Sequence, residues 1–323
     1  MMDKDKLETY KINLFFLSIH GKLPNFKELL YFSKYLLRFS EKEMFNEIIL
    51  KLESEMKISL DLSVQEKMSY LNDAKSRSVP KNVYMTLKTF DELNKNSEIH
   101  YVKKDWDDLI DVNVVRYNDI ECRHMLIDNF SEQIVNAYDK LVPGAYKSDL
   151  WRLCVLFLYG GIYSDVHIRP NLSKDTSSVL DAADYIFCID FPSSPKYIYN
   201  AMMKAPKGSK LLMSLINKIV SNVEKKVYPK SDLGISGPKL HGDVILDYLN
   251  IVNFEEGYVE FDDELFLFIS HKRKYVKGFE YTISLDDTDL FYCRYKGYKN
   301  ELSLICKNEH YSTLFKKKQV YKY

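Results

Sequence analysis

The sequence lacks most of the features that assign a protein to a class at once. Its 46 Lys and Arg residues equal its 46 Asp and Glu residues, so no excess charge favours nucleic acid as a partner. Its five cysteines are an odd number, are widely spaced and include no Cys-x-x-Cys pair, which argues against a disulfide framework and against a zinc cage. We therefore expect reduced thiols in a reducing compartment.

The sequence also lacks the short motifs of several large enzyme classes. It contains no Gly-rich phosphate loop, no Gly-x-Ser-x-Gly elbow and no His-Glu-x-x-His pair, so the commonest kinase, hydrolase and metalloprotease patterns are excluded. The apolar run at 12–19 is interrupted by Asn13 and Ser18 and is too short to cross a bilayer. We expect a soluble, cytoplasmic protein with no integral membrane segment.

What the sequence does contain is enough for a sizeable core. Its length of 323 residues exceeds that of a typical single domain, and 46% of the residues are hydrophobic. Residues 1–75 have helix-like apolar spacing, and from Val79-Pro80-Lys81 onward β-prone segments alternate with helical ones, which is typical of an α/β fold. We expect an N-terminal helical region at 1–75 and a second domain at 76–323. Strands are expected at 82–87, 112–117, 184–189, 200–203, 258–261, 265–269 and 281–283, and helices at 122–130, 131–141, 210–223 and 240–249, with a short helical-looking segment at 91–93.

One stretch, 145–170, concentrates more chemistry than any other. Its apolar run at 150–159 predicts a buried helix of about three turns. Gly160 and Gly161 then predict a helix stop, because glycine adopts the left-handed conformation at a helix end without steric cost. The alternating segment 162–168 predicts a strand after the turn.

Four polar residues flank this buried helix. Asp149 and Arg152 are three positions apart, so on a helix they share a face and can pair, either as a structural ion pair or as part of a site. On the predicted strand, Asp165 and His167 would project to one side, an arrangement that suits a divalent metal bridging a diphosphate. Taken alone, the histidine would more often be a surface or core residue without a metal.

Two segments carry a resemblance to a known family: Lys147-Ser148-Asp149-Leu150-Trp151-Arg152 and Leu158-Tyr159-Gly160-Gly161-Ile162-Tyr163-Ser164-Asp165. In this order they resemble the signature of the sugar transferases that contain an Asp-x-Asp motif, glycosyltransferase family thirty-two. That family includes yeast-type mannosyltransferases and capsular polysaccharide enzymes and is related to the clostridial glucosylating toxins. Val79-Pro80-Lys81 resembles its opening strand, and Ser236-Gly237-Pro238 its Gly-Pro loop. The resemblance covers roughly 79–249.

The resemblance implies a GT-A fold, a Rossmann-like nucleotide-sugar binding domain. It implies a retaining transferase that moves a hexose from a UDP- or GDP-sugar to a hydroxyl of a glycan or glycoprotein acceptor, with a divalent cation, Mn²⁺ or Mg²⁺. Asp149 and Arg152 would hold the donor sugar and its phosphate, Asp165 the ribose and the metal, and His167 the metal. The family usually has aspartate where this chain has His167, so the alternative is an impaired nucleotide-sugar or glycan-binding protein. A phosphodiester-cleaving enzyme would need more carboxylates than the motif supplies.

The expected site residues follow from this match and from neighbouring positions. The expected catalytic residues are Asp149, Arg152, Asp165 and Asn200, with Asp190 as a further carboxylate near the reacting centre. The expected donor-binding residues are Tyr84, Met85, Asp149, Arg152, Gly161, Ser164, Asp165, Val166, His167 and Ser312. For Tyr84 and Met85 a core role is equally open. The expected metal ligands are Asp165, His167 and His310, the last from a C-terminal segment that resembles the closing segment of related enzymes.

Overall fold

The structure is a computed structural model that describes residues 81–91, 93, 97–109, 112–174, 176–191, 196–306 and 309–322. The chain divides into two units, Met1–Ser78 and Val79–Tyr323. The helices predicted within 1–75 lie outside the described residues. None of the helices in the described part is long and apolar enough to cross a membrane.

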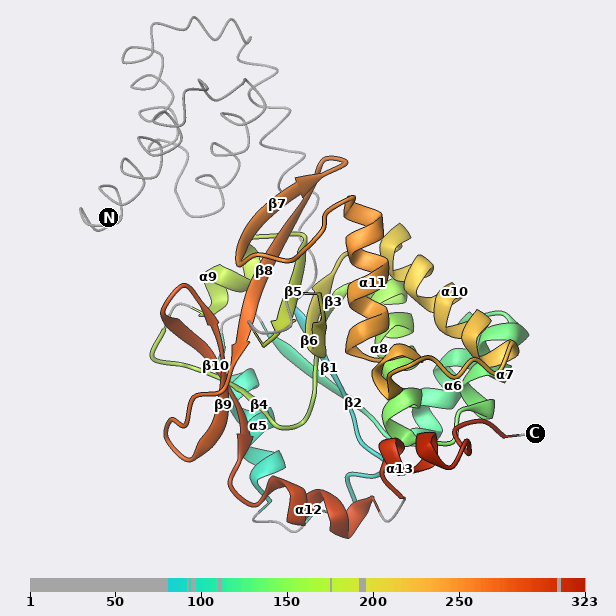
Figure 1. The fold of residues 1–323 in the computed structure, drawn as a ribbon. Coiled ribbons are helices and arrows are strands. Elements are labelled where there is room, and N and C mark those ends of the chain that lie inside the picture. The colour runs from blue at the N-terminus through green and yellow to red at the C-terminus, as the bar shows by residue number, and fades with distance from the viewer. Residues whose placement is uncertain are drawn as a thin grey trace, which may run out of the picture. The chain divides into compact units, whose positions relative to one another are not determined.

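The second unit is built on a mixed sheet of ten strands with helices on both sides (Figure 1). The strands are β1 (Asn82–Thr86), β2 (Asn113–Tyr117), β3 (Gly161–Ser164), β4 (Ile168–Pro170), β5 (Tyr185–Asp190), β6 (Ile198–Ala205), β7 (Gly257–Phe261), β8 (Glu264–Lys272), β9 (Phe279–Leu285) and β10 (Thr288–Tyr295). The helices are α5 (Glu98–Asp107), α6 (Asp119–Asn129), α7 (Glu132–Lys140), α8 (Gly144–Tyr159), α9 (Thr176–Asp181), α10 (Lys210–Glu224), α11 (Pro238–Leu249), α12 (Tyr298–Ile305) and α13 (Tyr311–Lys316), with a short 3₁₀ turn at Asp232–Gly234.

The order of the strands places several strand ends at one edge of the sheet. The order is β2-β1-β3-β6-β5-β8-β9-β10-β4, with β7 pairing β8. Strands β1, β2 and β3 are parallel, β6 runs antiparallel between β3 and β5, and β5 is parallel to β8. The carboxyl ends of β1, β2, β3, β5 and β8 therefore share an edge with the amino end of β6. In open α/β sheets ligands usually bind at this edge.

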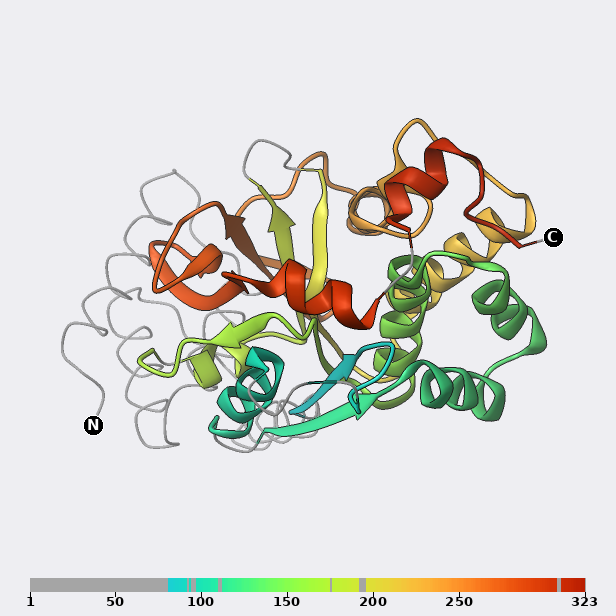
Figure 2. The same ribbon diagram turned by 90° about the horizontal axis from the view of Figure 1, so that it is seen from below.

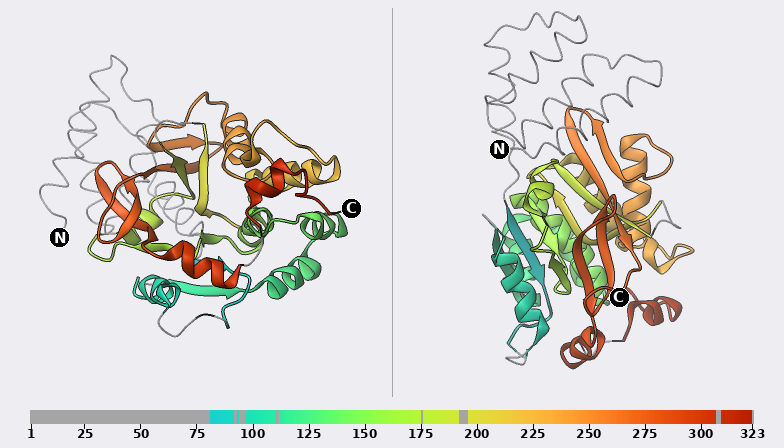
Figure 3. Two further views of the ribbon diagram at one scale, coloured as in Figure 1. Left: turned by 60° about the horizontal axis from the view of Figure 1, so that its bottom comes forward. Right: turned by 90° about the vertical axis from the view of Figure 1, so that its left-hand side faces the viewer.

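The α/β fold class is confirmed by this sheet, and its mixed strand order agrees with the GT-A expectation. Figure 2 views the molecule from below, with α12 crossing the edge that holds the strand carboxyl ends. In Figure 3 the end of β10 leads directly into α12 along that edge.

The strand predicted at 162–168 is wrong as a single element. The chain leaves β3 after Ser164, turns through Asp165, Val166 and His167, and re-enters the sheet as β4, which pairs with β10 at the far end of the strand order. Four Cα–Cα steps separate Ser164 from Ile168 and span at most about 14 Å, so the sheet must curl to bring β4 close to the end of β3. The two candidate ligands therefore lie on a turn, and the argument from strand alternation does not apply to them.

Helix α8 forms the centre of the core and begins earlier than the apolar run predicted. Leu150, Trp151 and Leu153 have no exposed side-chain surface and belong to the main apolar cluster. The helix ends where expected, with Gly160 at φ 66° and Gly161 at φ 114°, values that a side chain would make costly. The double glycine thus turns the chain from the helix directly into β3.

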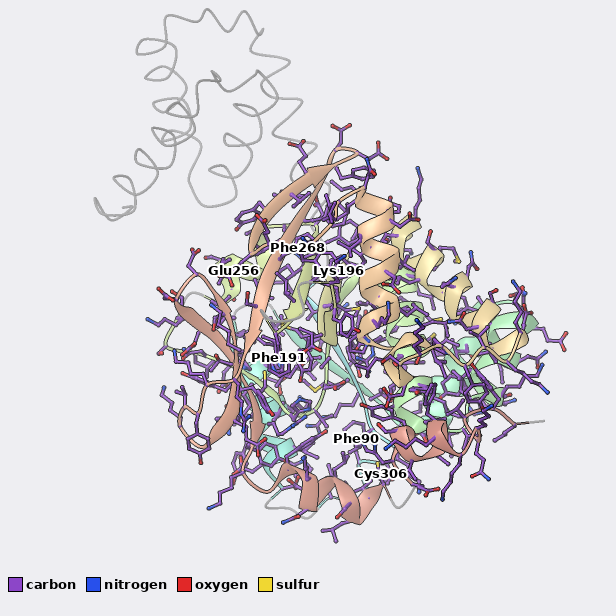
Figure 4. All side chains as sticks on the ribbon, in the orientation of Figure 1. Phe90, Phe191, Lys196, Glu256, Phe268 and Cys306 are labelled. Carbon is purple, nitrogen blue, oxygen red and sulfur yellow. The ribbon has the colours of Figure 1, made fainter. Side chains whose placement is uncertain are left out.

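Most of the other predicted elements are present with shifted ends, and five elements were missed. The helices predicted at 122–130, 131–141, 210–223 and 240–249 correspond to α6, α7, α10 and α11, and all seven predicted strands overlap observed ones. The helical-looking segment at 91–93 is a turn and bend where the structure describes it, and the helix α5 follows it. Strand β10 and helices α9, α12 and α13 were also not predicted. Figure 4 shows the side chains on the sheet and helices, with Phe268 of β8 in the core and Phe191 directly after the end of β5.

Candidate active site

Asp149 on α8 lies in a buried polar network. Its Oδ1 accepts a hydrogen bond from Nδ2 of Asn200 at 2.9 Å, and its Oδ2 accepts one from Oγ of Ser236 at 2.8 Å. Oδ1 also lies 3.3 Å from Nη2 of Arg152, so the predicted pair is formed. Burial raises the pKa of Asp149 to about 6, against the opposing effects of Arg152 and the hydrogen bonds. The carboxylate therefore joins α8, β6 and the Gly-Pro loop.

Arg152 links this network to the end of β3. Its side chain is only 5% exposed and donates to the carbonyl oxygens of Asn200 and, at 3.1 Å, Ser148. Its guanidinium lies 4.3 Å from the ring centroid of Tyr163, and Nη2 lies 3.7 Å from Oδ1 of Asp165. Arg152 is thus a buried cation between two carboxylates.

Asp165 is the more accessible of the two carboxylates. Its side chain is 28% exposed, against 9% for Asp149. The hydroxyl of Tyr163 donates to Oδ1 at 2.6 Å, and the backbone N–H of Asp165 donates to the carbonyl of Ala201 at 2.8 Å. The turn is therefore held to β3 and β6 while part of the carboxylate faces solvent.

His167 is buried and neutral at physiological pH. Its Nε2 lies 3.0 Å from the hydroxyl of Tyr199, its ring packs 4.6 Å from that of Tyr298, and Nδ1 has no hydrogen-bond partner in the described part of the chain. Burial lowers the pKa of His167 to about 4, although the charge of Asp165 acts in the opposite direction. A neutral imidazole with one unpaired nitrogen is the form in which histidine binds a metal.

The donor set fits a divalent cation that is shared with a substrate. Asp165 offers a hard, partly exposed carboxylate and His167 an unpartnered Nδ1, while Tyr199 at the other ring nitrogen resembles the hydrogen bond that usually orients a metal-binding histidine. Among the described residues no group of three or more His, Cys, Asp and Glu could hold a metal. Mn²⁺ and Mg²⁺ at transferase sites commonly take their other ligands from substrate phosphates and water.

A second polar group adjoins His167. The ring of Tyr199 stacks on that of His271 with centroids 3.9 Å apart and planes 5° apart, and Nδ1 of His271 lies 3.3 Å from Oδ1 of Asp190. Asp190 and His271 are register partners at the ends of the parallel strands β5 and β8. Asp190, which the sequence offered as a further carboxylate, is therefore connected to His167 through two rings.

The structure brings together five of the predicted residues in one site, and the other predicted residues lie around it or away from it. Asp149, Arg152, Asp165, His167 and Asn200 form the connected site described above. Tyr84, Met85, Gly161, Ser164 and Val166 are buried near it in β1, β3 and the following turn, and Tyr84 also stacks on Tyr159. His310 is exposed and caps α13, its Nδ1 accepting from the backbone N–H of Ser312 at 3.3 Å, and it does not join the two candidate ligands in a group of three. Roles for these outer residues in donor or metal binding stay predictions.

Sequence reasoning missed four residues of the site. These are Tyr199, Ser236, His271 and Arg294. Only His271 and Ser236 had a usable signal, since His271 comes two residues after the strand predicted at 265–269 and Ser236 begins the Gly-Pro loop. The roles of the other two depend on how β6 and β10 are placed in the sheet.

Comparison with a protein-family model supports the glycosyltransferase class. Residues 49–181 match the family model described as "Glycosyltransferase sugar-binding region containing DXD motif". This match spans both signature segments and confirms the resemblance found in the sequence, so the general activity that it supports is glycosyl transfer. The chain is also similar to a solved structure entitled "PaToxG Glycosyltransferase", with 18% identity and a TM-score of 0.40, covering 67% of this chain and 80% of that chain. No curated protein sequence matches this chain.

Proposed function

We propose that the protein is a retaining glycosyltransferase that moves a hexose from a UDP- or GDP-sugar to a hydroxyl group of a glycan or protein acceptor. The observation that carries this proposal is the chain of contacts Asp149–Arg152–Asp165 at the carboxyl edge of the parallel strands, in which only the last carboxylate is substantially exposed. The buried guanidinium of Arg152 helps to fix the position of the exposed carboxylate of Asp165. A preorganised donor site requires such fixed groups.

The residues have distinct roles in this proposal. Asp149 and Asn200 hold Arg152 in place, and Arg152 supplies positive charge on the protein side of the donor. Asp165 and His167 would hold a divalent cation, which we propose to be Mn²⁺, with Mg²⁺ as the other candidate. When bound, the cation neutralises charge on the nucleoside diphosphate leaving group. The neutral state of His167 means that it can ligate without first losing a proton.

Donor cleavage is the direct test. Purified protein is incubated with a panel of UDP- and GDP-sugars and Mn²⁺, and release of the nucleoside diphosphate is measured without added acceptor, with water taking the sugar. An early NMR spectrum of the released sugar should show the anomeric configuration of the donor. Inversion would refute retention while leaving glycosyl transfer in place.

The second candidate function is a nucleotide-sugar or glycan-binding protein without catalysis. The observation that favours it is the neutral imidazole of His167. A carboxylate at this position would bind a hard cation such as Mn²⁺ or Mg²⁺ more strongly than an imidazole does. The variant His167→Asp separates the two. We expect it to lower donor cleavage, because the ring and its bond to Tyr199 are lost from a fitted site. A clear gain in cleavage would instead mark the native site as impaired.

We further propose that residues 76–323 form the catalytic domain and that the protein works in a cytoplasm, bacterial or, for a virus, that of its host. All five cysteines are free, and four of them are buried, which is compatible with a reducing compartment. Limited proteolysis that yields an active fragment beginning near residue 76 would support the domain boundary. Subcellular fractionation would test the location.

A further inference from the structure

Arg294 lies directly opposite His167 at the closing edge of the sheet. Cys293 of β10 pairs with Ile168 of β4, and the backbone N–H of Arg294 donates to the carbonyl of His167 at 3.2 Å. The last residues of β10 are therefore tied to the turn that carries Asp165. Any ligand that reaches this turn from the β10 side must pass near Arg294.

The backbone of Arg294 is in an uncommon conformation. Its φ is 57°, and among the described non-glycine residues with positive φ it alone lies inside a strand, whereas the others lie in turns or just beyond element ends. Such conformations are unfavourable for residues with a Cβ and gather at functional sites. The conformation redirects the side chain relative to a regular strand.

The guanidinium of Arg294 is a cation with little neutralisation from the protein. Its nearest carboxylate oxygen is that of Glu280, 3.8 Å away, its Nε has no hydrogen-bond partner in the described part of the chain, and its side chain is 31% exposed. The guanidinium lies 5.1 Å from the ring centroid of Tyr281, and this ring limits the orientations that the Arg294 side chain can adopt. Tyr281 in turn packs against His271, with ring centroids 5.1 Å apart, and His271 stacks on Tyr199. Arg294 therefore faces the site.

The two arginines near Asp165 differ in what they can still bind. Arg152 is 5% exposed and is engaged by Asp149 and two carbonyl oxygens. Arg294 is about as exposed as Asp165 and keeps unpaired donors. A guanidinium with free N–H groups is suited to bind phosphate oxygens in pairs.

We propose that Arg294 is a binding residue for the diphosphate of the donor, contacting its phosphate oxygens from the β10 side of the site. This inference rests on the proposed function, since it assumes a nucleotide-sugar donor. It places a positive charge for the diphosphate on a residue outside the signature segments. It also gives the strand β10, which the family signature does not reach, a direct part in donor binding.

The test compares nucleoside diphosphates with monophosphates. UDP, GDP, UMP and GMP are titrated calorimetrically into the full chain in buffer with Mn²⁺, using the wild type and the variants Arg294→Gln, Arg294→Lys and Arg123→Gln. Arg123 is the matched control because it forms a surface ion pair with Asp139 on α6 and α7, away from the strand ends. Loss of a charge-assisted contact should weaken diphosphate binding about tenfold or more in Arg294→Gln.

The expected result is a lower ratio of diphosphate to monophosphate affinity in Arg294→Gln, an intermediate ratio in Arg294→Lys and an unchanged one in Arg123→Gln. A wild-type ratio in a folded Arg294→Gln variant would overturn the inference and leave the proposed function intact. An equal loss for both ligands in Arg294→Gln and Arg294→Lys, accompanied by a lower melting temperature, would overturn it in favour of a structural role. If the wild type binds none of the four nucleotides, the proposed function fails and the inference fails with it.

Discussion

The side-chain amide of Asn200 donates to Oδ1 of Asp149 across 2.9 Å, joining the amino end of β6 to helix α8. The sequence left two readings of Asp149 and Arg152, a structural ion pair or a site. The structure shows that the pair is buried and holds three segments together. Because breaking a buried pair costs about 3–5 kcal/mol, a change at Asp149 would affect folding and activity at once. Milder changes around it are more informative.

Ser236→Ala removes one hydrogen bond to Asp149 without removing its charge. The hydroxyl is fully buried and donates to Oδ2 at 2.8 Å, so its loss should lower the free energy of unfolding by about 1–3 kcal/mol. Denaturant unfolding followed by circular dichroism measures the change. Ser214→Ala is the control, since that hydroxyl bonds to a carbonyl on the exposed side of α10 and should cost little. Equal effects of the two substitutions would contradict the account of the buried network.

Gly242→Ala should disrupt the packing of α11 against the start of β6. A Cβ on Gly242 would lie 1.8 Å from the carbonyl oxygen of Lys196, a residue labelled in Figure 4, and backbone cannot give way as a flexible side chain does. We expect a loss of more than about 3 kcal/mol or failure to fold, measured by thermal unfolding. Gly144→Ala, at the start of α8 with nothing within 4 Å, should be neutral or slightly stabilising. A stable Gly242→Ala variant would show that the two segments are not in close contact.

His241 on α11 should make the stability of the fold depend on pH. It is fully buried, and burial together with the charge of Arg152 lowers its pKa to about 3, below the ordinary value of 6.5. Between these values the unfolded chain binds a proton that the folded chain does not, so stability falls as pH is lowered through this window and is unaffected above it. The loss is about 1.4 kcal/mol per pH unit.

The variant His241→Phe removes this titration and keeps a ring in the core. Chemical denaturation at pH 7 and at pH 4.5 should show the wild type losing on the order of 2–3 kcal/mol more than the variant. His167, whose pKa is also lowered, is present in both proteins and cancels in the comparison. Identical pH profiles would mean that His241 is accessible to protons in the folded state.

Asp165→Asn should separate activity from stability. Its partly exposed carboxylate accepts one hydrogen bond from Tyr163 and lies 3.7 Å from Arg152, which keeps Asp149 as its closer partner, so we expect a stability loss of only about 1 kcal/mol. Donor cleavage should fall by about a hundredfold or more, since the exposed acidic group of the site is lost. Asp243→Asn, on the exposed side of α11 in a surface pair with Lys239, is the control and should keep full activity. Retained cleavage in Asp165→Asn would remove this residue from the mechanism.

The sequence was most informative where local pattern alone decides structure. The apolar run of α8 and the double glycine predicted the helix and its end, because both depend on residues close in the chain. The turn at Asp165–His167 was missed, since alternation of polar and apolar residues looks the same in one strand and in two short strands separated by a turn. What distinguishes them is the pairing of β4 with β10, more than a hundred residues later.

Helix α5 shows a signal that was present and overlooked. Ile99, Val102 and Trp106 recur at helical spacing behind the N-cap Ser97, whose side chain accepts from the backbone N–H of Ile99. Arg294 shows the opposite case. Its place beside His167 depends on the register between β10 and β4, the last strand in the sheet order, which no local pattern specifies.

The central claim is that the edge around Asp165 binds and cleaves a nucleotide-sugar, and nucleoside diphosphate release tests it most directly. Wild type, Asp165→Asn and Asp243→Asn are incubated with the same UDP- and GDP-sugars and Mn²⁺, and the diphosphate is quantified by chromatography. The account predicts release from at least one donor by the wild type and by Asp243→Asn, with loss in Asp165→Asn. No release from any donor by the wild type, together with no calorimetric binding of UDP or GDP, would contradict it.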